Sequence, residues 1–395
     1  MRKSILLTAG FIILFAAEIL KVYFIMPFPG SQRSNSIDIA YFLHRHIIWF
    51  RVIGSLLVLP SLLTVLRNGR PGQRIFLSAL VILYAVVFYF FNFRFLADKM
   101  FYQPGNKRML TVAANQVDTN QLVIAAYMNG EARAYPIQII GYHHQVQDSI
   151  GGTPVLVTYC TVCRTGRIYS PMIQHVYQHF RLVGMDHFNA MFEDETSKSW
   201  WRQVTGEAIA GPMKGQQLTQ LPSSQMRLGT WISRHPNTLV LQPDTVYNTK
   251  YADLEGFDSG TIKSSLEKRD SASWKFKSWV VGVVESGHAR AYDWNQVVKE
   301  KVINDQLQQV PLVVQLDRDG MSFHVWKRNV GGQTLQFNWN DSSKLMNDAQ
   351  TGSSWNGQGY AIQGPLQGSQ LAEVQAYQEF WHSWQNFHPN TTTYR

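Results

Sequence analysis

Three long apolar runs occupy the first quarter of the chain. They cover residues 4–26, 47–66 and 75–93, and each is long enough for an α-helix to cross the roughly 30 Å hydrocarbon core of a bilayer. The first run is longer than the about 7–15 apolar residues of a secretory signal, and no small-x-small cleavage pattern follows it. The pattern therefore predicts a three-helix transmembrane region over residues 1–98.

The basic residues of this region predict its orientation. It contains ten Lys and Arg side chains against three acidic ones, whereas the remainder of the chain is almost balanced. Arg67, Arg70 and Arg74 crowd the loop between the second and third runs, and Arg2 and Lys3 precede the first. Loops rich in Lys and Arg stay in the cytoplasm, so we expect a cytoplasmic N-terminus and a large extracytoplasmic part.

The charge distribution also indicates which binding partners to expect. The basic residues flank apolar runs instead of clustering on a folded face, so no nucleic-acid partner is expected. The lipid bilayer is the expected partner, and other membrane or periplasmic proteins are further candidates. Within the apolar runs, Glu18 and Lys21 are three residues apart and can meet on one helix face. Arg51 either extends its head to the interface or pairs with Glu18.

The rest of the chain resembles itself. The string VIAAYMNGEARAYP at residues 123–136 aligns with VVGVVESGHARAYD at residues 280–293, and both matching regions end in His-Pro-Asn-Thr. Internal repeats determine architecture before local propensity does. We therefore expect repeat 1 at residues 99–245, a polar linker at residues 246–275 and repeat 2 at residues 276–395.

Within each copy, short segments rich in Val, Ile, Tyr and Trp alternate with Gly, Pro and Asn, which is typical of strands and turns. Asn129-Gly130 and Ser286-Gly287 predict hairpin turns, and the segment after Pro136 predicts a short helix that ends near Gly141. The expected fold class is a membrane-anchored protein. Three N-terminal transmembrane helices precede a β-rich (α+β) extracytoplasmic part made of two tandem homologous repeats.

The two copies differ in their reactive side chains. Cys160 and Cys163, the only cysteines of the sequence, follow a predicted strand of the first copy, and His143 and His144 end the predicted helix before it. The corresponding positions of the second copy hold neither Cys nor His. A reactive residue found in one copy only is not required by the shared fold, so these four residues form the predicted site.

Several chemistries fit this set. Two thiolates two residues apart can bind one copper or zinc ion, with His144 as a further ligand and His143 as its alternate. Alternatively, Cys160 is the nucleophile and Cys163 the resolving thiol of a thiol–disulfide oxidoreductase, with Arg164 lowering a thiol pKa. A plain disulfide that closes two residues would constrain little chain. Arg164 stands where haem attachment needs a His, so no haem is expected. A nucleotide cofactor is not expected either.

A third function class needs no chemistry at the cysteines. A Trp-rich surface and the seam between the two copies could serve a non-enzymatic assembly or ligand-binding module, so the sequence leaves open whether the protein is an enzyme. The acidic run Glu193-Asp194-Glu195 predicts a solvated turn before a helix rather than an acid–base pair.

The strings HHQVQDSIGGTPVLVTYCTVCRTGRIY and FEDETSKSWWRQVTGEAIAGP, followed by WISRHPNT, resemble a bacterial and archaeal family catalogued only as a domain of unknown function. The resemblance covers about residues 110–245. It implies an exported or membrane-anchored protein, here of the bacterial inner membrane with a large periplasmic part, and it implies no substrate. Carried onto this chain, the family pattern points to His144, Tyr159, Cys160, Cys163, Thr196, Ser199, Trp200 and Gln203.

The chain departs from the family pattern next to these residues. Gln145 replaces an acid, Thr161-Val162 replaces Pro-Leu, and Arg164 stands where Gly or Ser is frequent. Pro and Gly suit the tight turn of a metal knuckle, so their absence weakens that comparison.

Overall fold

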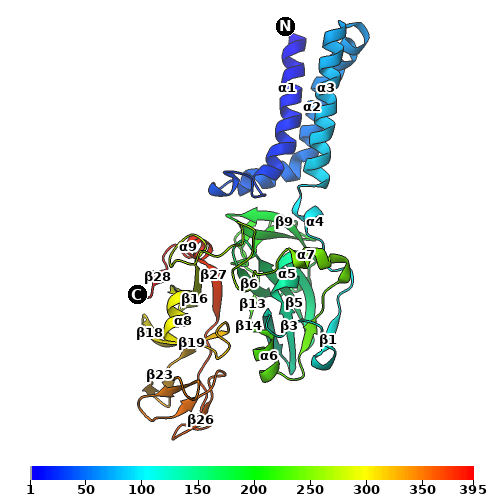
Figure 1. Ribbon diagram of the computed structural model, residues 1–395. Helices are drawn as coiled ribbons and strands as arrows, with labels where there is room; N and C mark the ends of the chain where they lie inside the picture. Colours follow the sequence, from blue (N-terminus) through cyan, green and yellow to red (C-terminus); the bar gives the residue numbers. More distant parts are fainter. Residues whose placement is uncertain (1) are drawn as a thin grey trace. The chain divides into compact units, whose positions relative to one another are not determined.

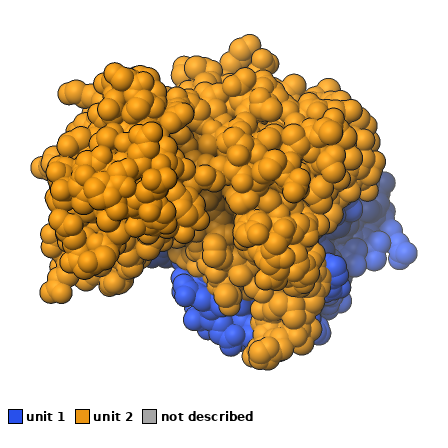
Figure 2. Space-filling view, turned by 90° about the horizontal axis from the view of Figure 1, so that it is seen from below, with its two compact units in different colours: residues 1–102, 178–202, 207–217 blue, residues 103–177, 203–206, 218–395 orange. Residues whose placement is uncertain are grey.

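The computed structural model describes residues 2–395, with the side chains of residues 4–395. The chain divides into two compact units, coloured separately in Figure 2. The first unit comprises residues 1–102, 178–202 and 207–217, and the second comprises residues 103–177, 203–206 and 218–395.

Three long helices open the first unit: α1 (Arg2–Tyr23), α2 (Ile37–Asn68) and α3 (Pro71–Phe93) (Figure 1). Each is long and apolar enough to cross a membrane, which confirms the prediction of three such helices. Leu56 and Ile75 are 67% and 70% exposed, as expected of a surface that faces lipid. Helix α2 begins ten residues before the predicted apolar run because the preceding segment, although more polar, contains no Gly or Pro to end it.

A buried polar cluster joins the three helices. The Glu18 carboxylate is 0% exposed and accepts hydrogen bonds from Arg51 Nε at 2.6 Å and from Asn92 Nδ2 at 2.9 Å. Lys21 Nζ lies 2.9 Å from the same carboxylate. Both pairings considered for Glu18 therefore occur together, and each of the three helices contributes at least one side chain.

An antiparallel sheet in the order β12-β11-β10-β9 completes the first unit. Its strands are β9 (Phe180–Asp186), β10 (Asn189–Asp194), β11 (Trp200–Arg202) and β12 (Ala208–Ala210); the short helices are η1 (Ser31–Arg33) and α4 (Ala97–Met100). The Trp200 indole donates to Glu193 at 3.0 Å and that of Trp201 to Asp194 at 2.9 Å. The predicted solvated turn before a helix is wrong here. Glu193 and Asp194 lie buried in β10, because their carboxylates satisfy the indole N–H groups.

The second unit is β-rich, as predicted. Its first half contains the five-stranded sheet β1-β15-β3-β2-β14, the sheet β13-β6-β5-β4 and the hairpin β7-β8. The elements are β1 (Met109–Thr111), η2 (Val112–Ala114), β2 (Leu122–Met128), β3 (Glu131–Pro136), α5 (Ile137–His143), β4 (Gln145–Ile150), β5 (Thr153–Cys160), β6 (Thr165–Tyr169), β7 (Met172–Ile173), β8 (Val176–Tyr177), β13 (Gln220–Leu221), β14 (Ser224–Arg227), α6 (Leu228–Arg234), β15 (Leu239–Leu241), η3 (Thr245–Tyr247) and α7 (Asn248–Ala252).

The second half contains the sheets β27-β16-β17-β28, β18-β19-β20 and β23-β24-β25-β26, and the hairpin β21-β22. The elements are β16 (Trp279–Glu285), β17 (His288–Asp293), α8 (Trp294–Glu300), β18 (Val302–Leu307), β19 (Val310–Leu316), β20 (Phe323–Lys327), β21 (Asn329–Val330), β22 (Gln333–Thr334), β23 (Phe337–Asn340), β24 (Leu345–Asp348), β25 (Ser354–Trp355), β26 (Ala361–Gln363), β27 (Ala376–Phe380), α9 (Trp381–Phe387) and β28 (Thr392–Thr393).

Both predicted hairpin turns are confirmed. β2 pairs with β3 and β16 pairs with β17, each antiparallel. Asn129 and Gly130 have φ of 48° and 86°, and Ser286 and Gly287 have φ of 50° and 78°. Positive φ at both central residues is the geometry of the two-residue hairpin turn that Asn-Gly favours. The helix predicted after Pro136 is α5, which runs two residues past Gly141.

One side-chain arrangement occurs in both halves. Asp148 accepts hydrogen bonds from Arg133 at 2.6 Å and from the Tyr135 hydroxyl at 2.8 Å. In the other half, Asp305 is bound by Arg290 at 2.6 Å and Tyr292 at 2.9 Å. The indoles of Trp231 and Trp384 likewise each donate at 2.8 Å to a threonine seven residues later.

We expect Glu18→Ala to destabilise the first unit by about 3 kcal/mol, because it leaves the Lys21 and Arg51 cations without their carboxylate. The measurement is unfolding of the purified protein in mixed detergent micelles, followed by tryptophan fluorescence. Asp38→Asn is the matched control, since the Asp38–Lys214 pair is exposed and should contribute little. Equal effects of the two substitutions would contradict a special role for the Glu18 cluster.

Candidate functional site

The two cysteines lie on the turn between β5 and β6. Cys160 ends β5, as predicted, and faces Thr165 across the hairpin, so residues 161–164 form the turn. Arg164 has φ of 57°, and its N–H donates to the Thr161 carbonyl at 3.3 Å. The Cys-x-x-Cys spacing therefore spans a hairpin turn rather than the start of a helix.

Both sulfurs are buried and in contact. Cys160 and Cys163 are 0% exposed, and both carry thiols. Burial, together with the hydrogen bond to Cys160, raises the pKa of Cys163 well above its ordinary value. Cys163 therefore stays protonated at neutral pH.

Lys277 is the cation that acts on both thiols. Burial lowers the pKa of Lys277, while the neighbouring Cys163 and Cys160 raise it. Its ammonium group donates to the Val162 carbonyl, inside the turn, at 2.5 Å. The Ser383 side chain is a further hydrogen-bonding partner of Cys163.

Residues far along the chain cover the turn. The N–H of Phe380 donates to the Cys163 carbonyl at 3.0 Å, and His382 Nε2 lies 3.3 Å from the Val162 carbonyl. Lys277, Phe380, His382 and Ser383 follow the cysteines by more than a hundred residues, and sequence reasoning missed them. No local pattern marks them, because they are brought to the turn by the pairing of β27 with β16.

Arg164, the predicted activator of a thiol, has other contacts. It is 0% exposed, and its guanidinium group lies 3.8 Å from the Trp279 ring centre and 4.9 Å from that of Phe257. It donates to Gln378 Oε1 at 2.8 Å and to the Phe257 carbonyl at 3.1 Å. These contacts anchor the turn to the second half of the unit.

The two predicted histidine ligands contact tyrosines. His143 Nε2 lies 2.7 Å from the Tyr251 hydroxyl. His144 caps the end of α5 with φ of 62°, and its Nδ1 donates to the Tyr142 carbonyl at 3.1 Å. Within residues 2–395, which the structure describes, no three His, Cys, Asp or Glu side chains form a group that could hold a metal ion. The copper or zinc set of Cys160, Cys163, His144 and His143 is not assembled in this arrangement.

Gln203 and Tyr159, which the family resemblance singled out, lie beside the cysteine hairpin. Gln203 donates from Nε2 to Thr158 Oγ1 at 3.0 Å and to the Thr165 carbonyl at 3.1 Å, so it binds both strands next to the turn. The Tyr159 ring packs edge-on against Phe257, and burial raises the pKa of Tyr159. Both residues position the hairpin.

Thr196, Ser199 and Trp200, the remaining residues singled out, belong to the first unit. The Thr196 N–H donates to Gln178 at 3.1 Å and that of Ser199 to Asp194 at 3.0 Å, while the Ser199 hydroxyl accepts from the Met213 N–H at 3.0 Å. Together with the bond from Trp200 to Glu193, these contacts hold the β9–β12 sheet.

Comparison with known families gives one match. The family model described as "Protein of unknown function (DUF3179)" matches residues 105–391, more than two thirds of the chain. The match agrees with the resemblance to a family of unknown function and also includes the second half of the second unit. No curated protein and no solved structure matches the chain.

Acid should destabilise the second unit through its buried histidines. Burial lowers the pKa of His382 to about 3 and that of His144 to about 4. The unfolded chain takes up these protons near pH 6.5, but the folded chain takes them up only at lower pH. The stabilisation is therefore complete above pH 6.5 and is lost as the pH falls toward 4, at about 1.4 kcal/mol per unit of pKa difference.

Denaturant unfolding between pH 7.5 and 4.5 tests this dependence on the buried imidazoles. His382→Gln keeps a donor for the Val162 carbonyl but removes the titrating ring, so its unfolding free energy should fall less steeply than that of the wild type. His288→Gln, at an exposed position, should behave as the wild type. Parallel pH profiles for all three proteins would refute the assignment.

Proposed function

Because the chain belongs to the DUF3179 family, whose function is unknown, we propose a role from its own geometry: Cys160 and Cys163 form a redox-active dithiol in a membrane-anchored protein. The observation that carries the proposal is that the two buried thiols share one hairpin turn, where the Lys277 ammonium group donates to the carbonyl of Val162 between them. Sulfurs in contact need little movement to form a disulfide, and a nearby cation favours the thiolate. This role requires no third ligand.

The reaction would be thiol–disulfide exchange with a partner disulfide. Cys160 loses its proton and attacks one sulfur of the partner, whose S–S bond breaks and releases one thiolate. Cys163 then loses its proton and attacks the Cys160 sulfur, which releases the second partner thiolate. The dithiol gives up two electrons and two protons to become a disulfide, and the partner disulfide is reduced to two thiols.

Burial controls access to the dithiol. Both sulfurs are 0% exposed, so a partner reaches them only when a covering residue moves. His382 is the candidate for that movement, because it contacts the Val162 carbonyl and also lines a surface pocket with Trp274, Phe276 and Trp381. Opening at His382 would expose the turn without unfolding the strands.

Copper binding on the same two sulfurs is the second candidate. Thiolates are soft ligands that select copper(I), and a two-coordinate ion would need only Cys160 and Cys163. The positive charge of Lys277 would offset the excess negative charge of two thiolates and one monovalent ion. Structural zinc requires about four ligands, so zinc is the less favoured ion.

We propose that the dithiol lies on the periplasmic side of the membrane. Arg67, Arg70 and Arg74 support a cytoplasmic N-terminus, which places the dithiol in the periplasm of a bacterial inner-membrane protein. We also infer that the halves of the second unit are two copies of one ancestral repeat. The recurring Arg-Asp-Tyr and Trp-Thr arrangements support this inference.

We expect the detergent-purified protein to show a reversible two-electron transition between dithiol and disulfide across a series of glutathione redox buffers. Trapping of thiols with a maleimide, followed by peptide mass spectrometry, should identify one Cys160–Cys163 bond. The Cys163→Ser variant should show no such transition.

A parallel titration with copper(I) against a chelator tests the second candidate. That candidate requires the wild type to bind one equivalent of copper(I) and the Cys160→Ser variant to bind none. Failure of both titrations would sink the proposal that the cysteines are the functional centre.

Lys277→Met should raise the pKa of the first thiol to ionise, because it removes the cation beside the thiols. The measurement is the ultraviolet absorbance of the thiolate as a function of pH. Lys277→Arg should preserve the wild-type curve, and Lys299→Met, at an exposed position in α8, is the matched control. An unchanged curve in Lys277→Met would exclude Lys277 from thiol activation.

A further inference from the structure

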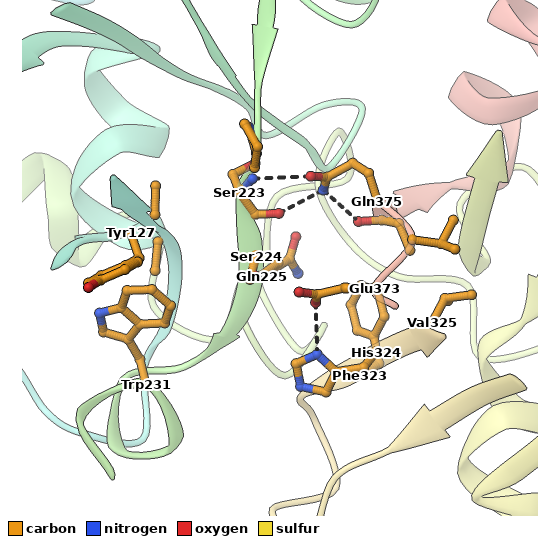
Figure 3. Close-up of a pocket in the computed structure, with 15 residues that line it drawn as sticks. Tyr127, Ser223, Ser224, Gln225, Trp231, Phe323, His324, Val325, Glu373 and Gln375 are labelled. Atoms are coloured by element: carbon orange, nitrogen blue, oxygen red, sulfur yellow. Dashed lines mark hydrogen bonds and ion pairs between the residues drawn. The ribbon is translucent and has the colours of Figure 1, made fainter. Parts of the chain in front are cut away.

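A cleft lies between the two halves of the second unit. Neither cysteine lines it. Its walls are β2 and β14 on one side, and β20 with residues 373–376 on the other (Figure 3). The cleft volume is about 310 Å³, at the lower end of the about 300–1,000 Å³ that small-molecule sites span. Gln375 ties the walls together, because it accepts from the Ser223 N–H at 3.1 Å and donates to the Ser223 carbonyl at 2.6 Å.

One wall of the cleft is aromatic. Tyr127 and Trp231 lie together on the side of the cleft opposite Glu373 (Figure 3). His235 stacks on Tyr127 with ring centres 5.2 Å apart, and its ring is tilted against Trp231 with ring centres 4.0 Å apart. Tyr127 is 57% exposed, so its ring is accessible. The aromatic face is therefore held in place and offers a π surface to a ligand.

The other wall is acidic. Glu373 Oε1 lies 3.3 Å from His324 Nδ1, and His324 Nε2 lies 2.8 Å from Arg234 Nη1. A guanidinium group can only donate, so Nε2 accepts and Nδ1 carries the hydrogen that it donates to Glu373. This orientation fixes the Glu373 carboxylate, whose side chain is 51% exposed.

Arg234 has further acidic neighbours. Arg234 also pairs with Asp317, and Asp319 acts on the same guanidinium group. Of the carboxylates that act on Arg234, Glu373 is the one that lines the cleft. Ser223 and Ser224 also line the cleft.

We propose that this cleft binds a small hydroxylated organic amine of the amino sugar class. The ammonium group of the ligand contacts the outward oxygen of Glu373, its apolar face stacks on Tyr127, and its hydroxyl groups bind Ser223 and Ser224. A carboxylate opposite an aromatic face selects cations, and hydroxyl partners inside the cleft select a polyol over a plain alkylamine. The proposal is independent of the dithiol.

Calorimetric titration of the full-length protein in detergent tests the proposal, with glucosamine as the probe and glucose as its neutral counterpart. We expect glucosamine to bind at least tenfold more tightly than glucose. Glu373→Gln should weaken glucosamine binding at least tenfold without changing the thermal midpoint of the protein. Tyr127→Ala, at an exposed position, is a second variant that should weaken binding several-fold.

Two controls separate this site from other effects. Glu300→Gln removes an exposed carboxylate of the same unit and should leave glucosamine binding unchanged. The Cys160→Ser variant should also bind glucosamine as tightly as the wild type, because the cysteines do not line the cleft. Failure of the dithiol proposal would therefore leave the glucosamine result unchanged. Any of three results would overturn the proposal. The wild type could bind glucosamine and glucose equally tightly, or it could fail to bind glucosamine. The third result is that the Glu373→Gln and Tyr127→Ala variants both bind glucosamine as tightly as the wild type.

Discussion

Two arginine side chains of the β5–β6 hairpin are buried, and the second unit depends on the partners that these charges require. Arg167 is 1% exposed and pairs with Glu379, which is 0% exposed. Arg164 lies against Trp279 and donates to Gln378. Moving a charge out of water costs several kcal/mol per ion unless partners replace the lost hydration. The hairpin is therefore stable only with β27 beside it, which couples the two halves of the unit.

The same packing sets the chemistry of the cysteine turn. Once β27 lies beside the hairpin, Phe380 and His382 satisfy the turn carbonyls, and Lys277 reaches the thiols. Burial alone would make the thiols inert by raising their pKa values, and Lys277 opposes that effect. The site thus combines protection from solvent with one local charge.

The first unit also buries charged side chains and gives them hydrogen-bond partners. Glu18 would be costly inside three apolar helices, but Arg51, Lys21 and Asn92 give it a complete set of donors. In the sheet of the same unit, Glu193 and Asp194 are buried because indole N–H groups need acceptors. In both places a buried carboxylate is retained because several donors converge on it.

The sequence by itself determined the features that depend on near neighbours. Most of the apolar run at residues 4–26 forms a helix, which ends at Tyr23, because length and hydropathy are properties of the run itself. Asn129-Gly130 had to turn because few residues tolerate positive φ at two successive positions. The position of Cys160 at a strand end was equally visible in the residues.

Only the tertiary structure decided which groups meet. It gave the thiols Lys277 where the sequence had suggested Arg164, and it brought His143 to Tyr251 rather than to a shared metal ion. Backbone preferences act over a few residues, whereas desolvation and electrostatic partners act through space between segments far apart in the chain. The chemistry of this protein is therefore fixed by the packing of β27 on the β5–β6 hairpin, a contact that no local pattern records.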